Sequence, residues 1–447
     1  MKLQHRASTR LTASVAALGT VTAMGLAACS SGGTSESGNA TSGSASGEVA
    51  QITYLHRLPD GDGMTKVNDI VARWNSAHPD IQVTATKFDG AAADMVKKLE
   101  TDINADNGPC LAQLGYGEVP TMYVKGLTED VTEYAEQYKS DFSEGTLNMM
   151  KVGDTVVGLP QDTGPMVYFY NKAEFDKLGI SVPTTAQEFI DTAAKTAAEG
   201  KYIAVFPTDE RQDWMSGLAA SAGAVWYSVV DDKWQVNVDS EESGRVASFW
   251  QTMLDDKSVP ALERWGDAFA KGTADHEIIG HLGAAWEAAL LLDTMKDTDN
   301  EGEWAVSVLP DFGAGEMSGP NGGSGVAVMK GCQYPEQAME FNDWFNTQID
   351  DLVTQGLVTA ATGAMTTPDA IKAFYGGQDV FATLNQANED MNPDWSFMPY
   401  FSAIGSDMGA AWPAAADGSA PVSNIFSGAQ SSSLKALTDA GLPAEAK

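Results

Sequence analysis

The alternation of hydrophobic period between residues 52 and 114 limits the fold of this chain more than any other feature. Apolar residues alternate with polar ones at 52–55 and again at 81–85, and a short apolar run occupies 111–114. Between these segments, the apolar residues of 67–74 and 95–103 recur at the spacing of one helical face. The order strand, helix, strand, helix, strand predicts a parallel α/β sheet.

Polar side chains follow the first and third predicted strands, where a parallel sheet places its ligands. The first strand and its loop carry Tyr54, His56 and Arg57, and the third strand is followed by Tyr116 and Glu118. We expect these five residues to lie at one edge of the sheet. His56 and Arg57 are also compatible with plain loop surface.

The charge balance excludes whole classes of partner. The 447 residues contain 27 Lys and Arg against 61 Asp and Glu, which gives a formal net charge of −34. Such an excess of acid repels the phosphate backbone of nucleic acids, so we expect no nucleic-acid partner. The chain has three Cys and no Cys-x-x-Cys pair, which rules out a zinc ribbon or a thioredoxin-type centre.

The first 28 residues have the layout of a secretory signal, with basic residues, an apolar segment and small residues before Cys29. The residues just before Cys29 resemble the bacterial lipobox, in which the Cys is acylated and becomes the new N-terminus. Residues 29–49 are rich in Ser and Gly and predict a disordered tether. Cys29 is therefore the predicted lipid anchor. The alternative is an ordinary secreted protein in which Cys29 is incidental.

Later segments repeat the same alternation of strand and helix. An apolar and aromatic run ends at Asn171, and Thr184 or Thr185 is placed to cap a helix, with Glu188 as the reciprocal acceptor. Residues 304–310 predict a strand. The glycine-rich stretch 322–325 predicts a turn that leads into a strand at 326–329.

Several of these pieces, in their common order, resemble extracellular solute-binding proteins of bacterial ABC importers, of the carbohydrate type related to maltose-binding protein. The matching pieces are Trp74-Asn75, His78-Pro79, the segment 152–172, Pro183-Thr184-Thr185, Glu188-Phe189, Phe269 to Gly272, Ala285-Trp286, Leu309-Pro310, the segment 322–328, and Ala338 to Phe341.

The resemblance implies an α/β, two-lobe fold of the periplasmic-binding-protein type, with a ligand cleft between the lobes and crossover hinge segments. We expect residues 50–162 plus 312–360 in lobe 1 and residues 163–311 plus 361–447 in lobe 2, with crossovers near residues 162–165, 311–320 and 358–362. It also implies an oligosaccharide ligand, a membrane permease with a cytoplasmic ATPase as partner, a location on the outer face of the cytoplasmic membrane, no cofactor, and a monomer.

A sugar offers weakly apolar faces and a belt of hydroxyl groups, so its site needs flat aromatic rings and charged or amide groups. Residues of these types at loop positions are the candidate ligand contacts; besides the five named above they are Asp162, Asp213, Trp214, Trp286, Glu287, Asn321, Asp394 and Trp395. Core packing is the competing interpretation for every Trp, and we assign Trp74, Trp250 and Trp344 to the core.

Enzymatic functions find little support. His276 and His281 are five residues apart, whereas the zinc-protease motif needs two His at i and i+4 on one helical face. We expect no metal site. No nucleophile elbow or phosphate-binding loop occurs. A secreted glycoside hydrolase that uses paired carboxylates stays open as the alternative function. Cys110 and Cys332 could pair, but their apolar contexts favour two buried thiols.

Overall fold

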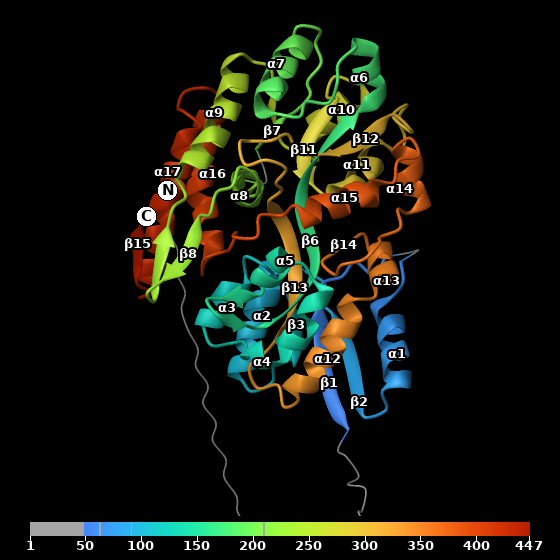
Figure 1. Cartoon of the computed structure of the whole chain (residues 1–447), viewed down its shortest axis with the longest axis vertical. Coiled ribbons are helices and arrows are strands. Elements are labelled where there is room, and N and C mark those ends of the chain that lie inside the picture. The colour runs from blue at the N-terminus through green and yellow to red at the C-terminus, as the bar shows by residue number, and fades with distance from the viewer. Residues whose placement is uncertain (1–48, 62–63, 91, 209–210) are drawn as a thin grey trace, which may run out of the picture. The chain divides into compact units, whose positions relative to one another are not determined.

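The computed structural model describes residues 49–61, 64–90, 92–208 and 211–447, and Figure 1 shows the arrangement of their elements. The predicted signal, the predicted lipid anchor Cys29 and the predicted tether up to residue 48 lie outside the described residues. The first part of the described chain follows the predicted alternation. Its elements are β1 (Ala50–His56), α1 (Val67–Ala77), β2 (Ile81–Lys87), α2 (Ala92–Asn104) and β3 (Leu111–Gly115).

The pairing of these strands confirms the predicted parallel sheet. β1 pairs in parallel with both β2 and β3, so the carboxyl ends of the three strands lie at one edge. Helix α1 buries Val67, Ile70, Val71 and Trp74, the stripe that the sequence predicted. Trp74 is in the core, as are Trp250 and, in part, Trp344.

The middle of the chain runs from short helices into one long strand and then alternates again. Its elements are α3 (Val119–Val124), α4 (Thr132–Ala135), α5 (Glu144–Asn148), β4 (Lys151–Val152), β5 (Thr155–Val156), β6 (Gly158–Asn171), α6 (Lys172–Leu178), α7 (Ala186–Ala197), β7 (Phe206–Pro207), α8 (Arg211–Ser221), β8 (Tyr227–Val230), β9 (Lys233–Val236), α9 (Glu241–Asp255), β10 (Ala261–Leu262), α10 (Asp267–Ala274), β11 (Gly280–Ala284), α11 (Glu287–Met295) and β12 (Trp304–Val308).

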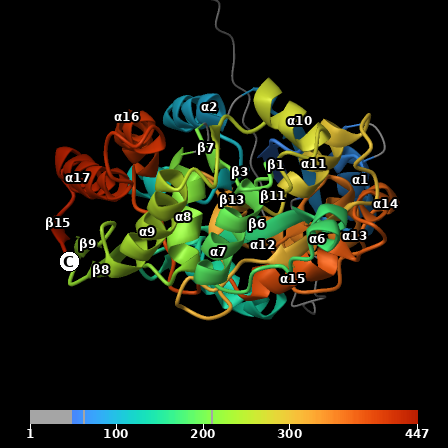
Figure 2. The ribbon, with the colours of Figure 1, turned by 90° about the horizontal axis from the view of Figure 1, so that it is seen from above.

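The last part returns to the first sheet and ends in a group of helices, with α16 and α17 packed on one another and α17 also on α9 (Figures 1 and 2). Its elements are β13 (Pro320–Val328), α12 (Pro335–Asn346), α13 (Ile349–Thr354), β14 (Val358–Thr359), α14 (Asp369–Phe374), α15 (Val380–Glu389), α16 (Ile404–Ala416), α17 (Ser423–Asp439) and β15 (Ala444–Ala446).

Strand β6 changes partners along its length. Its residues 158–165 pair with β13 and β14, whereas its residues 166–171 pair with β11 and β12, in each case antiparallel. The change falls next to residues 162–165, which the sequence placed at a crossover. The antiparallel neighbours make the sheet mixed, a feature that the strand and helix order did not predict. The lobe boundaries themselves stay a prediction.

Two local predictions have clear outcomes. Thr185 caps α7 by accepting a hydrogen bond from the Glu188 backbone N–H (3.2 Å), and the Glu188 carboxylate accepts one from Thr184 N–H (2.9 Å), which confirms the capping pair. The prediction of a turn at 322–325 is wrong. These residues lie within β13, whose register against β6 shifts between Pro320 and Gly323 and again between Ser324 and Gly325.

Cys110 and Cys332 form a disulfide, so the expectation of two buried thiols is also wrong. The reason is the pairing of β3 with β13, in which Leu111 lies opposite Val328. Cys110 precedes the start of β3 and Cys332 follows the end of β13, and their Cα atoms are 4.5 Å apart. The bond closes a loop of 222 residues in sequence.

Replacing Cys110 and Cys332 together by Ser should lower the free energy of unfolding by about 2–4 kcal/mol, because the unfolded chain regains the entropy of a long open loop. Chemical denaturation measures this change. Reductant should destabilise the unmodified protein and leave the double variant unaffected. Equal stability of the two proteins would contradict the prediction.

Candidate functional site

Arg57 and Glu118 form an ion pair at the carboxyl edge of the sheet. Arg57 directly follows β1 and Glu118 lies three residues beyond β3, and the parallel pairing of these strands brings the two side chains together. The Nη2–Oε2 distance is 3.3 Å, and the side chains are 17% and 24% exposed. This distance exceeds the 2.7–2.9 Å typical of a tight charge-assisted hydrogen bond. Glu118 Oε2 also accepts a hydrogen bond from the Gly115 backbone N–H (2.7 Å), and the partial exposure of both side chains leaves them accessible to a ligand.

A chain of hydrogen bonds joins this pair to Asp162 on β6. The Arg57 backbone N–H donates to Gln113 Oε1 (2.7 Å), Gln113 Nε2 donates to Ser324 Oγ (2.9 Å), and Ser324 Oγ donates to Asp162 Oδ1. Tyr116 Oη donates to the Asp162 backbone carbonyl (2.9 Å). Three strands, β3, β6 and β13, thus contribute to one polar group.

Burial raises the pKa of the Asp162 carboxyl to about 6, against the opposing effects of the Ser324 hydrogen bond and the Arg57 charge. The group is half-buried and titrates within two units of neutral pH. Asp162 therefore accepts hydrogen bonds as a charged carboxylate above this pKa, and it becomes neutral under mildly acidic conditions.

Two consecutive glycines of β13 bring aromatic rings to this polar group. Gly322 and Gly323 have φ values of +84° and +89°. A Cβ atom at Gly323 would lie 2.7 Å from the Tyr116 ring, and one at Gly322 would lie 3.3 Å from Trp286 Nε1. The missing side chains and the left-handed backbone let both rings approach the strand closely.

Trp286 is the half-buried indole of the site. It is the residue before α11, and its Nε1 donates to the backbone carbonyl of Asn321 (2.9 Å). Asn321 itself is 1% exposed and supports Trp286 through its main chain. We call Arg57, Glu118, Asp162, Ser324 and Trp286 the central group. Charged acceptors, a guanidinium and an indole face are the residue types that recognise an uncharged polyhydroxy ligand.

Several of the predicted contact residues are buried in this structure. Tyr54 is 1% exposed; its hydroxyl accepts a hydrogen bond from Gln161 (3.1 Å) within the core. His56 is 2% exposed, and burial lowers its pKa to about 4. Glu287 is fully buried, and its carboxylate is bound by Arg264 and His281. None of the three presents side-chain surface to a ligand.

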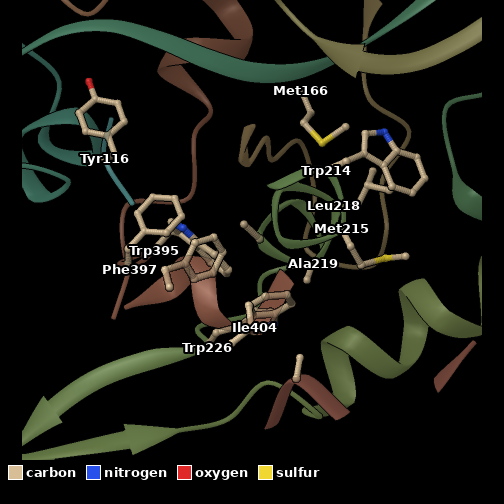
Figure 3. Close-up of a cluster of buried hydrophobic side chains, with 14 of the residues drawn as sticks. Tyr116, Met166, Trp214, Met215, Leu218, Ala219, Trp226, Trp395, Phe397 and Ile404 are labelled. Carbon is tan, nitrogen blue, oxygen red and sulfur yellow. The ribbon is translucent and has the colours of Figure 1, made fainter. Parts of the chain in front are cut away.

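Two of the predicted stacking rings also lie in the core, as Figure 3 shows. Trp214 is fully buried on α8, and its Nε1 donates to the Leu282 carbonyl (2.9 Å). Trp395 is fully buried between Trp226 and Phe397, with ring centroids 5.3 and 5.9 Å away. Neither ring is exposed in this structure, and their contact with a ligand stays a prediction.

Asp213 lies in the first turn of α8, and Asp394 is exposed at the wall of a cavity of about 320 Å³. None of the residues that line this cavity belongs to the central group, and its wall includes Asn148, Lys151 and Trp234 as well as Trp395. In the described ranges, no three or more His, Cys, Asp or Glu side chains are grouped so that they could hold a metal ion. Within the same part of the chain, none of the helices has the length and apolarity needed to cross a membrane.

Sequence reasoning missed Gln113, Ser324 and Arg264. The glycine pair at 322–323 was the available signal for Ser324, because a strand that carries glycines is one that other groups approach closely. Gln113 lies within an apolar strand, and Arg264 lies far along the chain from Glu287 in a loop of mixed composition. Nothing in the local pattern marked either residue.

Known proteins resemble this chain over most of its length. A family model described as bacterial extracellular solute-binding protein matches residues 69–374. The galacto-N-biose-/lacto-N-biose I-binding protein of the ABC transporter from Bifidobacterium longum, solved in complex with lacto-N-biose, is 50% identical with a TM-score of 0.81. That alignment covers 90% of this chain and 100% of the other.

More distant relatives are similar to this chain in structure or in sequence. The sugar-binding protein MalE from Xanthomonas citri is 16% identical with a TM-score of 0.72, over 88% of this chain and 98% of the other. The arabinooligosaccharide-binding protein of Halalkalibacterium halodurans is 23% identical over 296 residues, which are 63% of this chain and 64% of that relative. The chain thus spans less than two thirds of that curated relative. The likenesses confirm the predicted α/β fold of the periplasmic-binding-protein type.

The raised pKa of Asp162 predicts a pH-dependent stability. The folded state binds the proton more tightly than the unfolded chain, so the stabilisation is present below pH 3.8 and is lost as pH rises through about 6. An Asp162→Asn variant keeps an acceptor for Ser324 and does not ionise. We compare the unfolding free energy of the variant with that of the unmodified protein. This difference should favour the variant by about 1–3 kcal/mol more at high pH than at low pH.

Thermal unfolding of the two proteins from pH 4 to pH 8 tests this effect. The difference between them should grow up to pH 7 and then level off. A difference that is constant over the whole range would mean that Asp162 titrates as an ordinary surface carboxylate.

Proposed function

We propose that this chain, which belongs to the family of bacterial extracellular solute-binding proteins, is the substrate-binding component of an ABC transporter for oligosaccharides. The central group carries the proposal, because it combines a half-buried indole with two carboxylates and a guanidinium at one edge of the sheet. A micromolar dissociation constant, about −8 kcal/mol, would suit capture for import.

A disaccharide of the lacto-N-biose or galacto-N-biose kind is the proposed ligand. The support is the 50% identity to a binding protein solved with lacto-N-biose, over 90% of this chain and the whole of the other. Charge-assisted hydrogen bonds from sugar hydroxyls to Asp162 and Glu118 would supply specificity, and the Trp286 indole would cover one apolar face of a ring. We keep Arg57, Glu118, Asp162 and Trp286 as proposed direct contacts, with Tyr116 and Asn321 as their supports.

The alternative of a glycoside hydrolase is set aside. The family binds solutes and does not transform them, so the chain is a binding protein and not an enzyme. It acts outside the cytoplasm, as the family description states. The two carboxylates of the central group are therefore assigned to hydrogen bonding.

The partition of residues 50–162 plus 312–360 and 163–311 plus 361–447 into two lobes is part of the proposal, and so is hinge closure around the ligand. The change of partners along β6 supports it, because one continuous strand pairs with different neighbours on either side of residues 162–165. A permease with a cytoplasmic ATPase would receive the closed form.

Titration calorimetry with lacto-N-biose, galacto-N-biose, an arabino-oligosaccharide and maltose tests the ligand assignment. We expect saturable heat with the first two sugars. Trp286→Ala should weaken their binding by at least about 1 kcal/mol, since an interface ring lost from a packed site costs this much or more. Trp344→Ala is the matched control, because Trp344 is also half-buried but packs on Trp74. An absence of heat with every sugar would refute the carbohydrate assignment.

We also propose that Cys29 carries the lipid anchor. A Cys29→Ser variant should carry no lipid, and it should separate from membranes without detergent. Intact-mass spectrometry of the two proteins measures the modification. A membrane-bound Cys29→Ser protein, or an unmodified Cys29 in the parent, would contradict the assignment.

A further inference from the structure

Three ionisable side chains lie in the core directly behind Trp286. Arg264 is 2% exposed, and His281 and Glu287 are fully buried. Arg264 Nη1 lies 2.5 Å from Glu287 Oε1, and His281 Nε2 lies 2.5 Å from Glu287 Oε2. We call Arg264, His281 and Glu287 the buried charge cluster.

Aromatic and apolar side chains surround this cluster. The His281 ring lies 6.3 Å from Phe169 and 5.6 Å from Phe269, centroid to centroid. Removing charges from water carries a penalty, and apolar replacements of a buried ion pair are often neutral or stabilising. Stability alone therefore gives little reason for three such groups, which points to a role in positioning a neighbour.

The cluster restrains the turn that carries Trp286. Glu287 Oε1 accepts a hydrogen bond from the Ala284 backbone N–H (3.0 Å), which closes residues 284–287 between β11 and α11. Trp286 lies within this closed turn. A Cβ atom at Gly283 would lie 2.4 Å from Glu287 Oε2, so the backbone approaches the carboxylate closely. The Glu287 carboxylate thus helps to hold the turn that carries Trp286.

Arg264 also reaches the ring itself. Its Cζ atom lies 6.0 Å from the Trp286 ring centroid and 5.7 Å from that of Trp265. Trp265 has a φ of +61°, an uncommon conformation for a bulky residue that persists only where its surroundings enforce it. The guanidinium therefore lies within about 6 Å of two indole rings, one of which belongs to a residue with a constrained backbone.

We propose that Arg264, His281 and Glu287 are positioning residues that fix the Trp286 indole in its ligand-binding orientation. The inference rests on the proposed function, in which Trp286 contacts the sugar. The cluster fixes the ring from the core side through the turn at 284–287 and the Arg264 guanidinium. The Asn321 backbone carbonyl also holds the ring by accepting the hydrogen bond of its Nε1. Glu287 thus acts on the ligand through Trp286.

Glu287→Gln tests the proposal, since it keeps the size of the side chain and removes its charge. With lacto-N-biose as the ligand, we expect the dissociation constant to rise about tenfold. Fluorine NMR of the protein labelled with fluorotryptophan, with Trp286 assigned by Trp286→Phe, reports on the ring directly. The Trp286 signal should shift or broaden while the signals of indoles remote from the cluster, such as Trp74 and Trp344, stay in place.

Glu174→Gln is the matched control. Glu174 is also a largely buried carboxylate paired with two cations, Lys177 (2.9 Å) and Lys201 (3.0 Å), and lies on α6. Its loss should lower the unfolding temperature and leave both the affinity and the Trp286 signal unchanged. This control separates the general cost of breaking a buried ion pair from the specific effect on the ring.

A triple variant, Arg264→Met with His281→Leu and Glu287→Met, covers the case in which Glu287→Gln does not fold, because apolar side chains remove the unpaired charges. Arg264→Lys, which keeps the charge but not the planar fork, is the mildest change. Wild-type affinity and an unmoved Trp286 signal in the folded members of this set would overturn the proposal. If Trp286→Ala itself leaves the affinity unchanged, the proposed ligand site fails instead.

Discussion

The antiparallel pairing of β6 with β13 is the interaction on which the rest of the structure depends. β13 returns to the first sheet beside β3, and β6 continues from that sheet to β11 and β12. The central group forms where these strands meet, because Asp162 belongs to β6 and Ser324 to β13. A residue on either strand is therefore held by main-chain hydrogen bonds as well as by its own contacts.

The irregularity of that pairing is what makes room for the site. A regular ladder would carry a side chain at every position of β13, and the register shifts around residues 320–325 would be absent. Gly322 and Gly323 remove the side chains at the point where two aromatic rings approach. The strand is thus irregular where its backbone contacts Tyr116 and Trp286. The regular strand pairs on either side stabilise this irregular segment.

The sequence predicted the strands and helices of residues 50–115 well because each has one apolar face, and the spacing of that face differs between helix and strand. The meeting of Arg57 and Glu118 followed from the parallel pairing alone. The disulfide and the bulged strand did not follow, because both depend on β13 returning beside β3 from more than 200 residues away. Hydrophobic period carries no information on such long-range pairing.

The aromatic residues show why polar neighbours in sequence are a poor guide to a ligand site. Trp214 follows Arg211, Gln212 and Asp213, yet it begins a stretch of α8 in which every residue up to Ser221 is buried, because the fold encloses this helix on all sides. Before Trp395, Asn392 donates to the carbonyls of Ala220 and Ala224, both at 3.0 Å. The polar side chain of Asn392 therefore satisfies backbone carbonyls inside the protein. Trp286 has only alanines and Glu287 beside it in sequence, yet it is the indole of the central group. Exposure of an aromatic ring is decided by tertiary packing and by which polar groups the fold must satisfy internally.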